Sequence, residues 1–321
     1  MTRFLLHRLS QSILVILVVS TLIFFGVFLI GDPTTLLIPP EANQATVNEV
    51  KRSLGLDLPM HQQYLRFLAN AIQGDLGRSY VFRVSALVVI FERLPATLEL
   101  AFSAMFIAVV IGVPLGMLAG CYPDSWVDRT LMIGSTFGFS VPTFWAGLLF
   151  ILLFSVNLGW LPASGRGDTV SVYGVHLSLL TLDGLTHLLL PAFNLAVFPL
   201  AFIIRLTRSG MREAIGLDFV RFALAQGNTR WQVIRIYVLK FISIPIVTLV
   251  GMYLGVLIAF AVVTESVYSW PGTGKLIIDS INVLDRPVII AYIMVTVLVF
   301  SIINLIVDIL YSVLDPRIRT E

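Results

Sequence analysis

One short stretch, Gly272-Thr273-Gly274-Lys275, is similar to a nucleotide-binding loop. A phosphate-binding loop needs a glycine, four further residues and then Gly-Lys-Ser/Thr, because its backbone amides, lysine and hydroxyl together hold phosphates and Mg²⁺. Here Ser269 stands where the first glycine should be, and Leu276 follows the lysine. The chain therefore has no recognisable ATPase motif of its own.

Metal and redox chemistry also lack the residues that they need. The single cysteine, Cys121, cannot form an internal disulfide. The four histidines show neither metal-ligand spacing nor a nearby cysteine pair, and they are too scattered to form a catalytic set: His7, His61, His176 and His187. We expect no catalytic residue, no metal site and no cofactor in this chain, which is not predicted to be an enzyme.

Membrane helices would have to hold whatever functional residues the chain has. Of its 321 residues, 57% are hydrophobic and 12% are charged, against about 25% charged in soluble domains. The net charge of +2 does not indicate a partner nucleic acid. Crossing a hydrocarbon core of ~30 Å takes about 20 apolar residues in a helix. Six stretches qualify: 9–30, 96–119, 141–158, 185–204, 244–263 and 289–313. An all-α integral membrane protein follows.

Basic residues near the span ends predict the orientation. Arg3 and Arg8 precede the first hydrophobic run, and no small-residue cleavage site follows it, so we interpret that run as a retained helix. Seven basic residues fall between spans four and five: Arg205, Arg208, Arg212, Arg221, Arg230, Arg235 and Lys240. Both termini are therefore expected in the cytoplasm, on the same side as this fourth loop.

Ionisable residues are rare inside the spans. Glu99 lies near the outer end of the second span, and Asp308 lies in the last one. A secondary transporter usually carries paired charges at membrane depth and inverted repeats, and neither is visible. We interpret both acids as structural groups that water or a loop cation satisfies.

The outer segments are not featureless. Residues 46–53 predict a helix that stops at Gly55, and apolar residues at helical spacing continue to Ile72 before Gly74-Asp75-Leu76-Gly77. These residues are expected to form a folded cap on the outer membrane face.

A second outer segment follows span five. Trp270-Pro271-Gly272 is expected to form a rigid turn before a short helix over 275–283. Trp270 either anchors in lipid headgroups or contacts a delivered substrate. Glu265 either steers a cationic substrate or pairs with a basic side chain. Glu265, Trp270, Pro271 and Gly272 are the outer-mouth candidates.

Glycines recur every four residues in two spans and predict close helix packing: Gly112, Gly116 and Gly120 in span two, and Gly251 and Gly255 in span five. Prolines in or beside the spans predict kinks or broken helices: Pro114, Pro142, Pro191, Pro199 and Pro245.

The fourth loop has a composition that a plain connection would not need. Residues 211–226 read as an amphipathic helix with an apolar side formed by Ile215, Phe219, Phe222 and Ala223. Gly227 suits a left-handed stop, and Thr229 with Gln232 is a capping-box start for the next helix. Small residues around the turn (Ala223, Ala225, Gly227) would let a partner approach closely. The physical pattern leaves two interpretations open, a protein-docking face or a helix lying on lipid.

Here the sequence resembles a known family. The run from Glu213-Ala214 through 219–227 is similar to the cytoplasmic coupling motif of inner-membrane permeases of bacterial ABC importers, in particular the dipeptide/oligopeptide/nickel permease family. Further matches run along the chain: Gly31-Asp32-Pro33, Leu54-Gly55-Leu56-Asp57, Gln63-Tyr64-Leu65, Gly74-Asp75-Leu76-Gly77, Ala96-Thr97-Leu98-Glu99-Leu100, Thr264-Glu265, Ser269-Trp270-Pro271-Gly272 and Asp315-Pro316-Arg317-Ile318-Arg319. One departure is Leu224-Ala225-Gln226, where family members often carry basic residues.

The resemblance implies a six-transmembrane-helix type I ABC importer permease fold in the bacterial inner membrane. It divides the chain into a cytoplasmic N-terminus and first helix (1–30), a periplasmic loop subdomain (31–95), a permease core (96–313) with a coupling loop (205–243), and a cytoplasmic tail (314–321). The residues implied to couple to an ATPase are Glu213, Ala214, Asp218, Phe219, Arg221, Ala223, Ala225 and Gly227.

The resemblance also implies partners. These are a second homologous permease, two cytoplasmic ABC ATPases that bind ATP and Mg²⁺, and a periplasmic substrate-binding protein, all beside membrane lipid. Dipeptides or oligopeptides are the first expectation for the cargo, and nickel chelates, glutathione, opines or sugars are alternatives. A membrane scaffold or a secondary transporter is the alternative from a different class.

Overall fold

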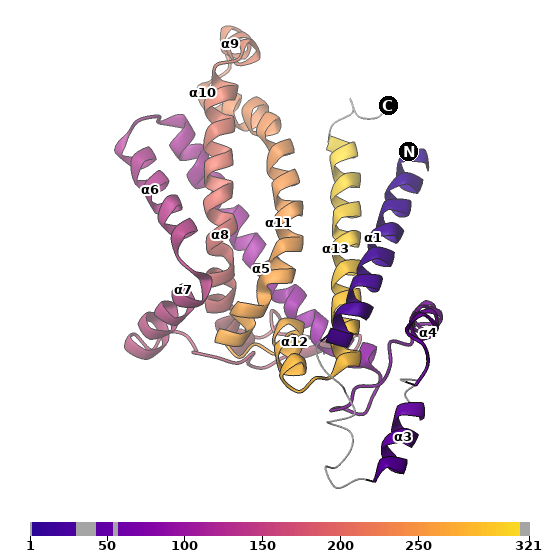
Figure 1. The fold of residues 1–321 in the computed structure, drawn as a ribbon. Coiled ribbons are helices and arrows are strands. Elements are labelled where there is room, and N and C mark those ends of the chain that lie inside the picture. Colours follow the sequence, from indigo (N-terminus) through magenta and orange to yellow (C-terminus); the bar gives the residue numbers. More distant parts are fainter. Residues whose placement is uncertain (1, 30–42, 54–56, 315–321) are drawn as a thin grey trace. The chain divides into compact units, whose positions relative to one another are not determined.

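The computed structural model describes residues 2–29, 43–53 and 57–314, which are mostly helical (Figure 1). The motifs at Gly31-Asp32-Pro33 and at Gly55, and the tail beyond residue 314, lie outside the described residues. The chain divides into two compact units. Unit 1 comprises residues 1–96 and 271–301, and unit 2 comprises residues 97–270 and 302–321.

Unit 1 contains the predicted outer helices. They are α3 (Gln44–Ser53) and α4 (Met60–Ile72), and α1 (Thr2–Leu29) precedes them. α4 packs on α1, because the ring of Phe24 stacks on that of Phe67 at 5.6 Å and the hydroxyls of Thr21 and Tyr64 lie 2.6 Å apart. The two helices expected between residues 46 and 72 are thus confirmed.

A buried carboxylate ties the remaining parts of unit 1 together. Asp285 lies between α12 (Thr273–Asn282) and α13 (Arg286–Leu314) and is fully buried. It accepts hydrogen bonds from the hydroxyl of Ser79 at 2.5 Å and from the backbone amides of Tyr80 and Val81 at 3.2 and 3.3 Å. Burial raises the pKa of Tyr80, although the charge of Arg286 opposes that effect. α12 confirms the short helix expected over 275–283.

Unit 2 is built around α8 (Leu182–Ile215), which packs against α6 (Trp126–Ser140), α7 (Thr143–Phe150) and α11 (Leu239–Val267). α11 continues a helical run that starts with α10 (Arg230–Val233) and the π-helix η2 (Ile234–Val238). α5 (Ala86–Cys121) contributes its residues from Thr97 onward. The C-terminal end of α8 and the start of the α10–η2–α11 run therefore lie at the same end of unit 2, close to the turn that follows α8 (Figure 1).

Four helical runs among the described residues are long and apolar enough to cross a membrane: Ala86–Cys121, Leu182–Ile215, Arg230–Val267 and Arg286–Val307. They contain the predicted spans two, four and five and most of span six, and three of them extend well beyond the predicted ends. α1 covers all of the first predicted span but its last residue.

The third predicted span, 141–158, is wrong as a straight crossing. α6 lies before it, and α7 with the π-helix η1 (Ile151–Asn157) bends away from α6 by 107°. Val141 is extended because a following proline disfavours the helical conformation, and Pro142 has no amide hydrogen to continue the helix. The two halves pass the test for a membrane span only as a bent pair.

The glycines of α5 do allow close packing. A Cβ atom on Gly116 would lie 2.6 Å from the Cβ of Thr207 and 2.7 Å from the carbonyl oxygen of Ile204, and one on Gly112 would lie 2.8 Å from Ile203. A Cβ atom on Gly120 would likewise clash with the side chain of Met211. α5 and α8 therefore approach along the predicted stripe, and Gly251 likewise makes room for Val307 while Gly255 is buried.

Unit 2 also contains a small β-hairpin. β1 (Val170–Val172) pairs antiparallel with β2 (Val175–Leu177). Tyr173 and Gly174 connect them with positive φ angles of 51° and 82°, as a tight type I′ turn requires. No pattern in the sequence predicted this hairpin.

Candidate functional site

The helix after α8 is shorter than the predicted amphipathic helix. α8 continues to Ile215, and a separate helix, α9, covers Asp218–Ala225, so the prediction of a single amphipathic helix over 211–226 is wrong. The amides of Gly216 and Leu217 close the last turn of α8 on the carbonyls of Glu213 and Ala214, both at 3.1 Å. Leu217 then becomes extended, so the helix axis changes direction before α9.

The end of α9 has the predicted geometry. Gly227 adopts a φ of +87°, and its amide donates to the carbonyl of Leu224 at 3.0 Å. The side chain of Asn228 donates to the carbonyl of Ala223 at 2.9 Å. Thr229 and Gln232 form the expected capping box at the start of α10. The left-handed stop and the helix–turn–helix are both confirmed.

One face of α9 is buried within this chain. Val220 and Ala223 belong to a hydrophobic cluster that also contains residues from the ends of α8, α10, η2 and α11: Met211, Ala214, Val233, Ile234, Val238, Ile242 and Ile246. Burial of these side chains fixes α9 on the end of the bundle. The helix therefore packs on the ends of α8 and α11 through this cluster.

α9 also carries two exposed apolar side chains, which lie on different sides of the helix because they are two positions apart. Phe222 is 66% exposed and Leu224 is 43% exposed, with Asp218 and Arg221 beside them. Phe222 and Ala223 were expected on one apolar side of the helix, but only Ala223 is buried in the chain, together with Val220, and Phe222 is exposed. α9 projects from the end of unit 2 (Figure 1). An exposed apolar knob of this kind is typical of a docking surface.

The predicted coupling residues divide between exposed and buried positions. Glu213, Asp218, Arg221, Ala225 and Gly227 are exposed, and Phe219 is half-buried. Ala214 and Ala223 are buried inside the chain and cannot meet a partner directly. Ala223 and Ala225 face opposite ways because positions two apart on a helix differ by about 200°. Phe222 and Leu224 were missing from the predicted set, although helical periodicity counted from Asp218 would have indicated Phe222, four residues later.

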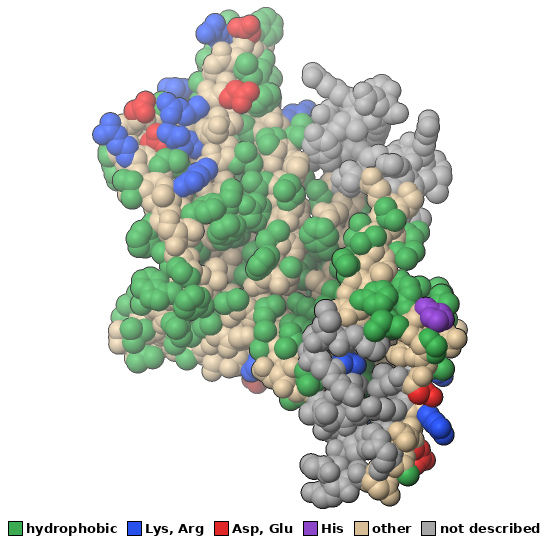
Figure 2. All heavy atoms as spheres, viewed as in Figure 1, with side chains coloured by type: hydrophobic (Ala, Val, Ile, Leu, Met, Phe, Trp, Pro, Cys, Tyr) green, Lys and Arg blue, Asp and Glu red, His purple; other side chains and the backbone are tan. Residues whose placement is uncertain are grey.

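Arginines next to this segment brace the bundle. Arg205, Arg208 and Arg212 were expected in a loop but lie on α8. Arg208 makes a two-pronged ion pair with buried Asp128 on α6, and Arg205 donates to the hydroxyls of Ser135 and Thr136 at 3.1 and 2.7 Å. In Figure 2 the charged side chains of unit 2 gather at the end that carries α9, above a largely hydrophobic face.

A second polar cluster in unit 2 surrounds Glu99. Its carboxylate accepts from Arg166 at 2.7 Å and from the amide of Leu179 at 2.7 Å. Arg166 also donates to the carbonyl of His176 and the hydroxyl of Ser178, at 2.6 and 2.9 Å. A loop cation was one of the two partners predicted for Glu99, and the structure shows that this cation is Arg166. The acid at the end of a span was the only signal for it.

Two outer-mouth candidates are buried in unit 2. Trp270 has no exposed surface and lies under the guanidinium of Arg166, 5.7 Å from the ring centroid, so the interpretation of Trp270 as a headgroup anchor is wrong. Glu265 is also fully buried and accepts from the hydroxyl of Thr97 at 2.6 Å. It therefore cannot steer a solute from solvent in this conformation. Both residues are part of the packing, a role that hydropathy alone could not reveal.

The other two candidates belong to unit 1. Pro271 and Gly272 line a pocket of about 310 Å³ together with Arg93, Lys275 and Asp279. Contact of this region with a delivered solute stays a prediction. Among the described residues, no group of three or more His, Cys, Asp or Glu side chains is placed to hold a metal ion.

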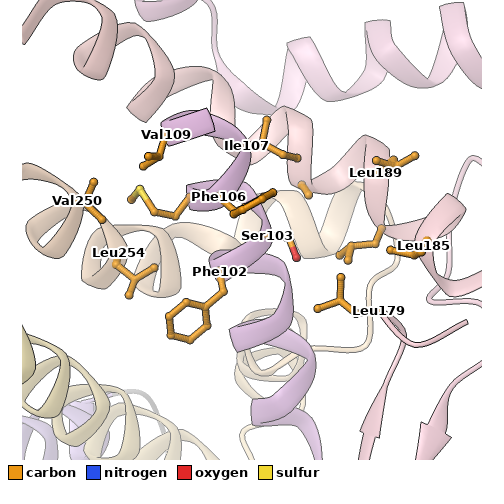
Figure 3. Close-up of a pocket in the computed structure, with 13 residues that line it drawn as sticks. Phe102, Ser103, Phe106, Ile107, Val109, Leu179, Leu185, Leu189, Val250 and Leu254 are labelled. Atoms are coloured by element: carbon orange, nitrogen blue, oxygen red, sulfur yellow. The ribbon is translucent and has the colours of Figure 1, made fainter. Parts of the chain in front are cut away.

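An apolar groove of about 710 Å³ lies in unit 2 between α5, α8 and α11 (Figure 3). Its walls include Phe102 and Phe106 from α5, Leu185 and Leu189 from α8, and Val250 and Leu254 from α11. Ser103 is its only hydroxyl-bearing residue. A groove of this composition offers no partner for a charged solute.

Comparison with known families accounts for this combination of features. Residues 112–320 match the family of the binding-protein-dependent transport system inner membrane component, and residues 1–101 match the N-terminal component of the same membrane proteins. The chain belongs to this family. It is an inner-membrane permease subunit with multiple membrane helices.

Relatives are similar to this permease over nearly their whole length. The dipeptide transport system permease protein DppB of Escherichia coli K12 is 37% identical, with 99% of each chain covered. The di/tripeptide transport system permease protein DppB of Pseudomonas aeruginosa is 38% identical with full coverage. The glutathione transport system permease protein GsiC of Escherichia coli K12 is 36% identical, again with 99% of each chain covered.

Solved structures support the fold of the permease. A chain of the MetNI methionine ABC transporter in an inward-facing conformation matches with a TM-score of 0.54 at 18% identity, covering 71% of this chain and 96% of that one. A second crystal form of the same transporter gives 0.55. The expected type I ABC importer permease fold is thereby confirmed.

Proposed function

We propose that this permease forms half of the translocation pathway of an ATP-driven importer for di- and tripeptides and similar small solutes. The cargo is inferred from its relatives, two of which carry dipeptide or di/tripeptide in their names. The mechanism is inferred from α9, whose exposed Phe222, opposite the buried face of the helix at the end of the bundle, is the single observation that carries the proposal.

α9 is suited to transmit a movement of separate ATPase subunits to the membrane helices. Its inner face shares one hydrophobic cluster with α8, η2 and α11, so a push on Phe222 or Leu224 moves these helices as a unit. Two cytoplasmic ATPases would bind ATP and Mg²⁺, and their closure would act on α9 of each permease. Coupling of this kind biases a two-state element from a distant site.

The orientation and the remaining partners belong to the same proposal. The arginines around α9 favour the cytoplasmic side for this end of unit 2, because basic residues accumulate there. With six crossings, both termini would then be cytoplasmic. A second homologous permease would complete the pathway, and a periplasmic binding protein would deliver the solute to the opposite side.

Glutathione is the second candidate cargo. A glutathione permease is 36% identical to this chain, close to the identity of the dipeptide permeases, so sequence similarity separates the two cargoes poorly. Glutathione is itself a tripeptide, and one pathway could pass both. Nickel chelates, opines and sugars have less support.

Transport by the complete importer tests the proposal. Proteoliposomes would contain this chain, the second permease, both ATPases and the cognate binding protein, with labelled dialanine, trialanine or glutathione outside. We expect uptake of dialanine or trialanine that depends on ATP. Uptake of glutathione alone would replace the first cargo with the second, and uptake that persists without ATP would contradict an ATP-driven importer.

A pair of variants tests the coupling part. Phe222→Asp should weaken retention of the ATPases about thirtyfold, since an exposed aromatic anchor at the centre of an interface contributes on the order of 2 kcal/mol. Tyr173→Asp is the control, because Tyr173 is also an exposed aromatic residue but lies in the β1–β2 turn. If Phe222→Asp retained its ATPases and transported normally, α9 would not be the dock.

A further inference from the structure

A second groove lies near the end of unit 2 that carries α9. It has a volume of about 520 Å³ and runs between the last turns of α5 and the start of the α10–η2–α11 helical run. Its floor is apolar and includes Met117 and Leu118 from α5 and Ile234 and Leu239 from the helical run. The groove therefore has the lining that a hydrocarbon chain would require.

Two arginines border this groove. Arg230 opens α10, and Arg235 lies one and a half turns later in η2. Neither arginine is in an ion pair within the described part of the chain, whereas Arg166, Arg208 and Arg212 are all paired with acids. Two exposed cations beside an apolar floor are complementary to a ligand with an anionic head and an apolar tail.

The aromatic residues of the groove point to the membrane interface. Trp231 is 65% exposed and Tyr122 is 61% exposed, and both line the groove. Tryptophan and tyrosine accumulate where hydrocarbon meets headgroups, because their rings are apolar and their tips are polar. The helical run from Arg230 to Val267 has 38 residues, about 57 Å at about 1.5 Å per residue, so it is longer than a hydrocarbon core of ~30 Å and at least one of its ends extends past that core.

We propose that this groove binds one anionic phospholipid, with its phosphate between Arg230 and Arg235 and an acyl chain over Met117, Leu118 and Leu239. Arg230 begins the helix that follows the turn at Gly227. A bound lipid would therefore brace the base of the coupling segment. The leaflet in which the lipid lies rests on the orientation proposed above, whereas the groove and its ligand chemistry do not depend on the cargo.

The chain contains a natural probe for occupancy. Cys121 is its single cysteine, is half-buried and lines the groove. A lipid in the groove would cover this thiol. The rate at which neutral N-ethylmaleimide labels Cys121, followed by mass spectrometry of the peptide that contains it, therefore reports occupancy.

The experiment compares the full chain in nanodiscs of phosphatidylcholine with and without phosphatidylglycerol, each with and without the ATPases. We expect phosphatidylglycerol to slow the labelling of Cys121 even without the ATPases. Native mass spectrometry should find one phosphatidylglycerol molecule retained on the chain. Equal labelling rates in both lipids would overturn the proposal. Protection that appears only when ATPases are added would identify the groove as an ATPase contact and would also overturn it.

Variants separate the arginines from a general charge effect. Arg230→Gln and Arg235→Gln should each weaken retention of phosphatidylglycerol about fivefold. Arg129→Gln is the matched control, because Arg129 is an exposed arginine of α6 outside the groove. An equal loss in all three variants would overturn the site. If a groove variant failed to fold, the wild-type comparison would still decide. The lipid experiment needs neither ATP nor cargo. A negative result in it therefore leaves the importer proposal standing, and a negative transport result leaves the lipid site standing.

Discussion

Glu99 and Arg166 show how one acid near the end of a span organises the polypeptide around it. The side chain of Glu99 is 1% exposed and that of Arg166 is 11% exposed, so both charges are largely removed from water. Their charge requires a partner, and Arg166 also makes hydrogen bonds with the carbonyl of His176 and the hydroxyl of Ser178. This pair holds the segment of the hairpin against α5.

Removing either partner of this pair should destabilise the permease. Glu99→Gln leaves the buried guanidinium of Arg166 without a counter-charge, and such losses typically cost about 3 to 5 kcal/mol. The free energy of unfolding, measured by titrating the purified protein from mild detergent into dodecyl sulfate, should fall by that amount. The double variant Glu99→Gln/Arg166→Gln should lose less than the sum of the two single variants.

An exposed pair supplies the control. Arg221 and Asp218 lie 3.7 Å apart on α9, where both side chains are largely exposed. Arg221→Gln should change the free energy of unfolding by no more than about 0.5 kcal/mol. Strictly additive losses at Glu99 and Arg166 would show that the two residues are not coupled.

Among the elements, α5 and α8 depend on the absence of side chains at their contact. Helix association in lipid relies on close packing because surrounding hydrocarbon is as apolar as the helices themselves. Thr207 and the backbone of Ile204 occupy the space that a side chain on Gly116 would need. The backbone of α8 cannot move away from α5 without disturbing α6 and α11, which pack on it.

Gly116→Ala should therefore destabilise the bundle even though alanine favours helices more than glycine does. The added Cβ would lie 2.6 Å from Thr207, and overpacking of this kind costs about 1 to 3 kcal/mol. Gly134→Ala on α6 is the matched control, because Gly134 is exposed with open space around it. The midpoint of thermal unfolding should fall for the first variant only. Equal midpoints would mean that α5 and α8 are less closely packed than the structure indicates.

For the whole molecule, the number of membrane crossings determines which side each terminus faces. Within the described part of the chain, four helical runs are long enough to cross a membrane, α1 covers all but the last residue of the first predicted span, and the pair of α6 with α7 and η1 is bent by 107°. If the bent pair crosses once, the total is even and both termini share a side. If it returns to its own side, the C-terminus lies opposite the N-terminus.

Reporter fusions should place both termini in the cytoplasm. Green fluorescent protein at either end should fluoresce, and alkaline phosphatase at either end should be inactive, because the basic residues around α8 and α9 hold that side inward. Phosphatase activity at the C-terminus alone would show that the bent pair does not cross. Phosphatase activity at both ends would reverse the orientation and would place α9 beyond the reach of cytoplasmic ATPases.

Much of the architecture was predictable from local features of the sequence. Hydropathy predicted all the spans except the third, because a lipid-embedded helix must be apolar along a fixed length. The turn at Gly227 and the capping box at Thr229 and Gln232 were also predictable, since both depend on residues within one turn of one another. The glycine stripe on α5 was readable because it repeats once per turn of its own helix.

Other features depended on residues distant in sequence, and only the tertiary structure decided them. Arg166 became the partner of Glu99, Trp270 was buried beneath that arginine, and Phe222 turned outward because Val220 and Ala223 filled the cluster with α8 and α11. Composition can indicate that a side chain prefers apolar surroundings or needs a counter-charge. It cannot say which of many equivalent neighbours meets that need, because the answer depends on how helices separated by dozens of residues pack together.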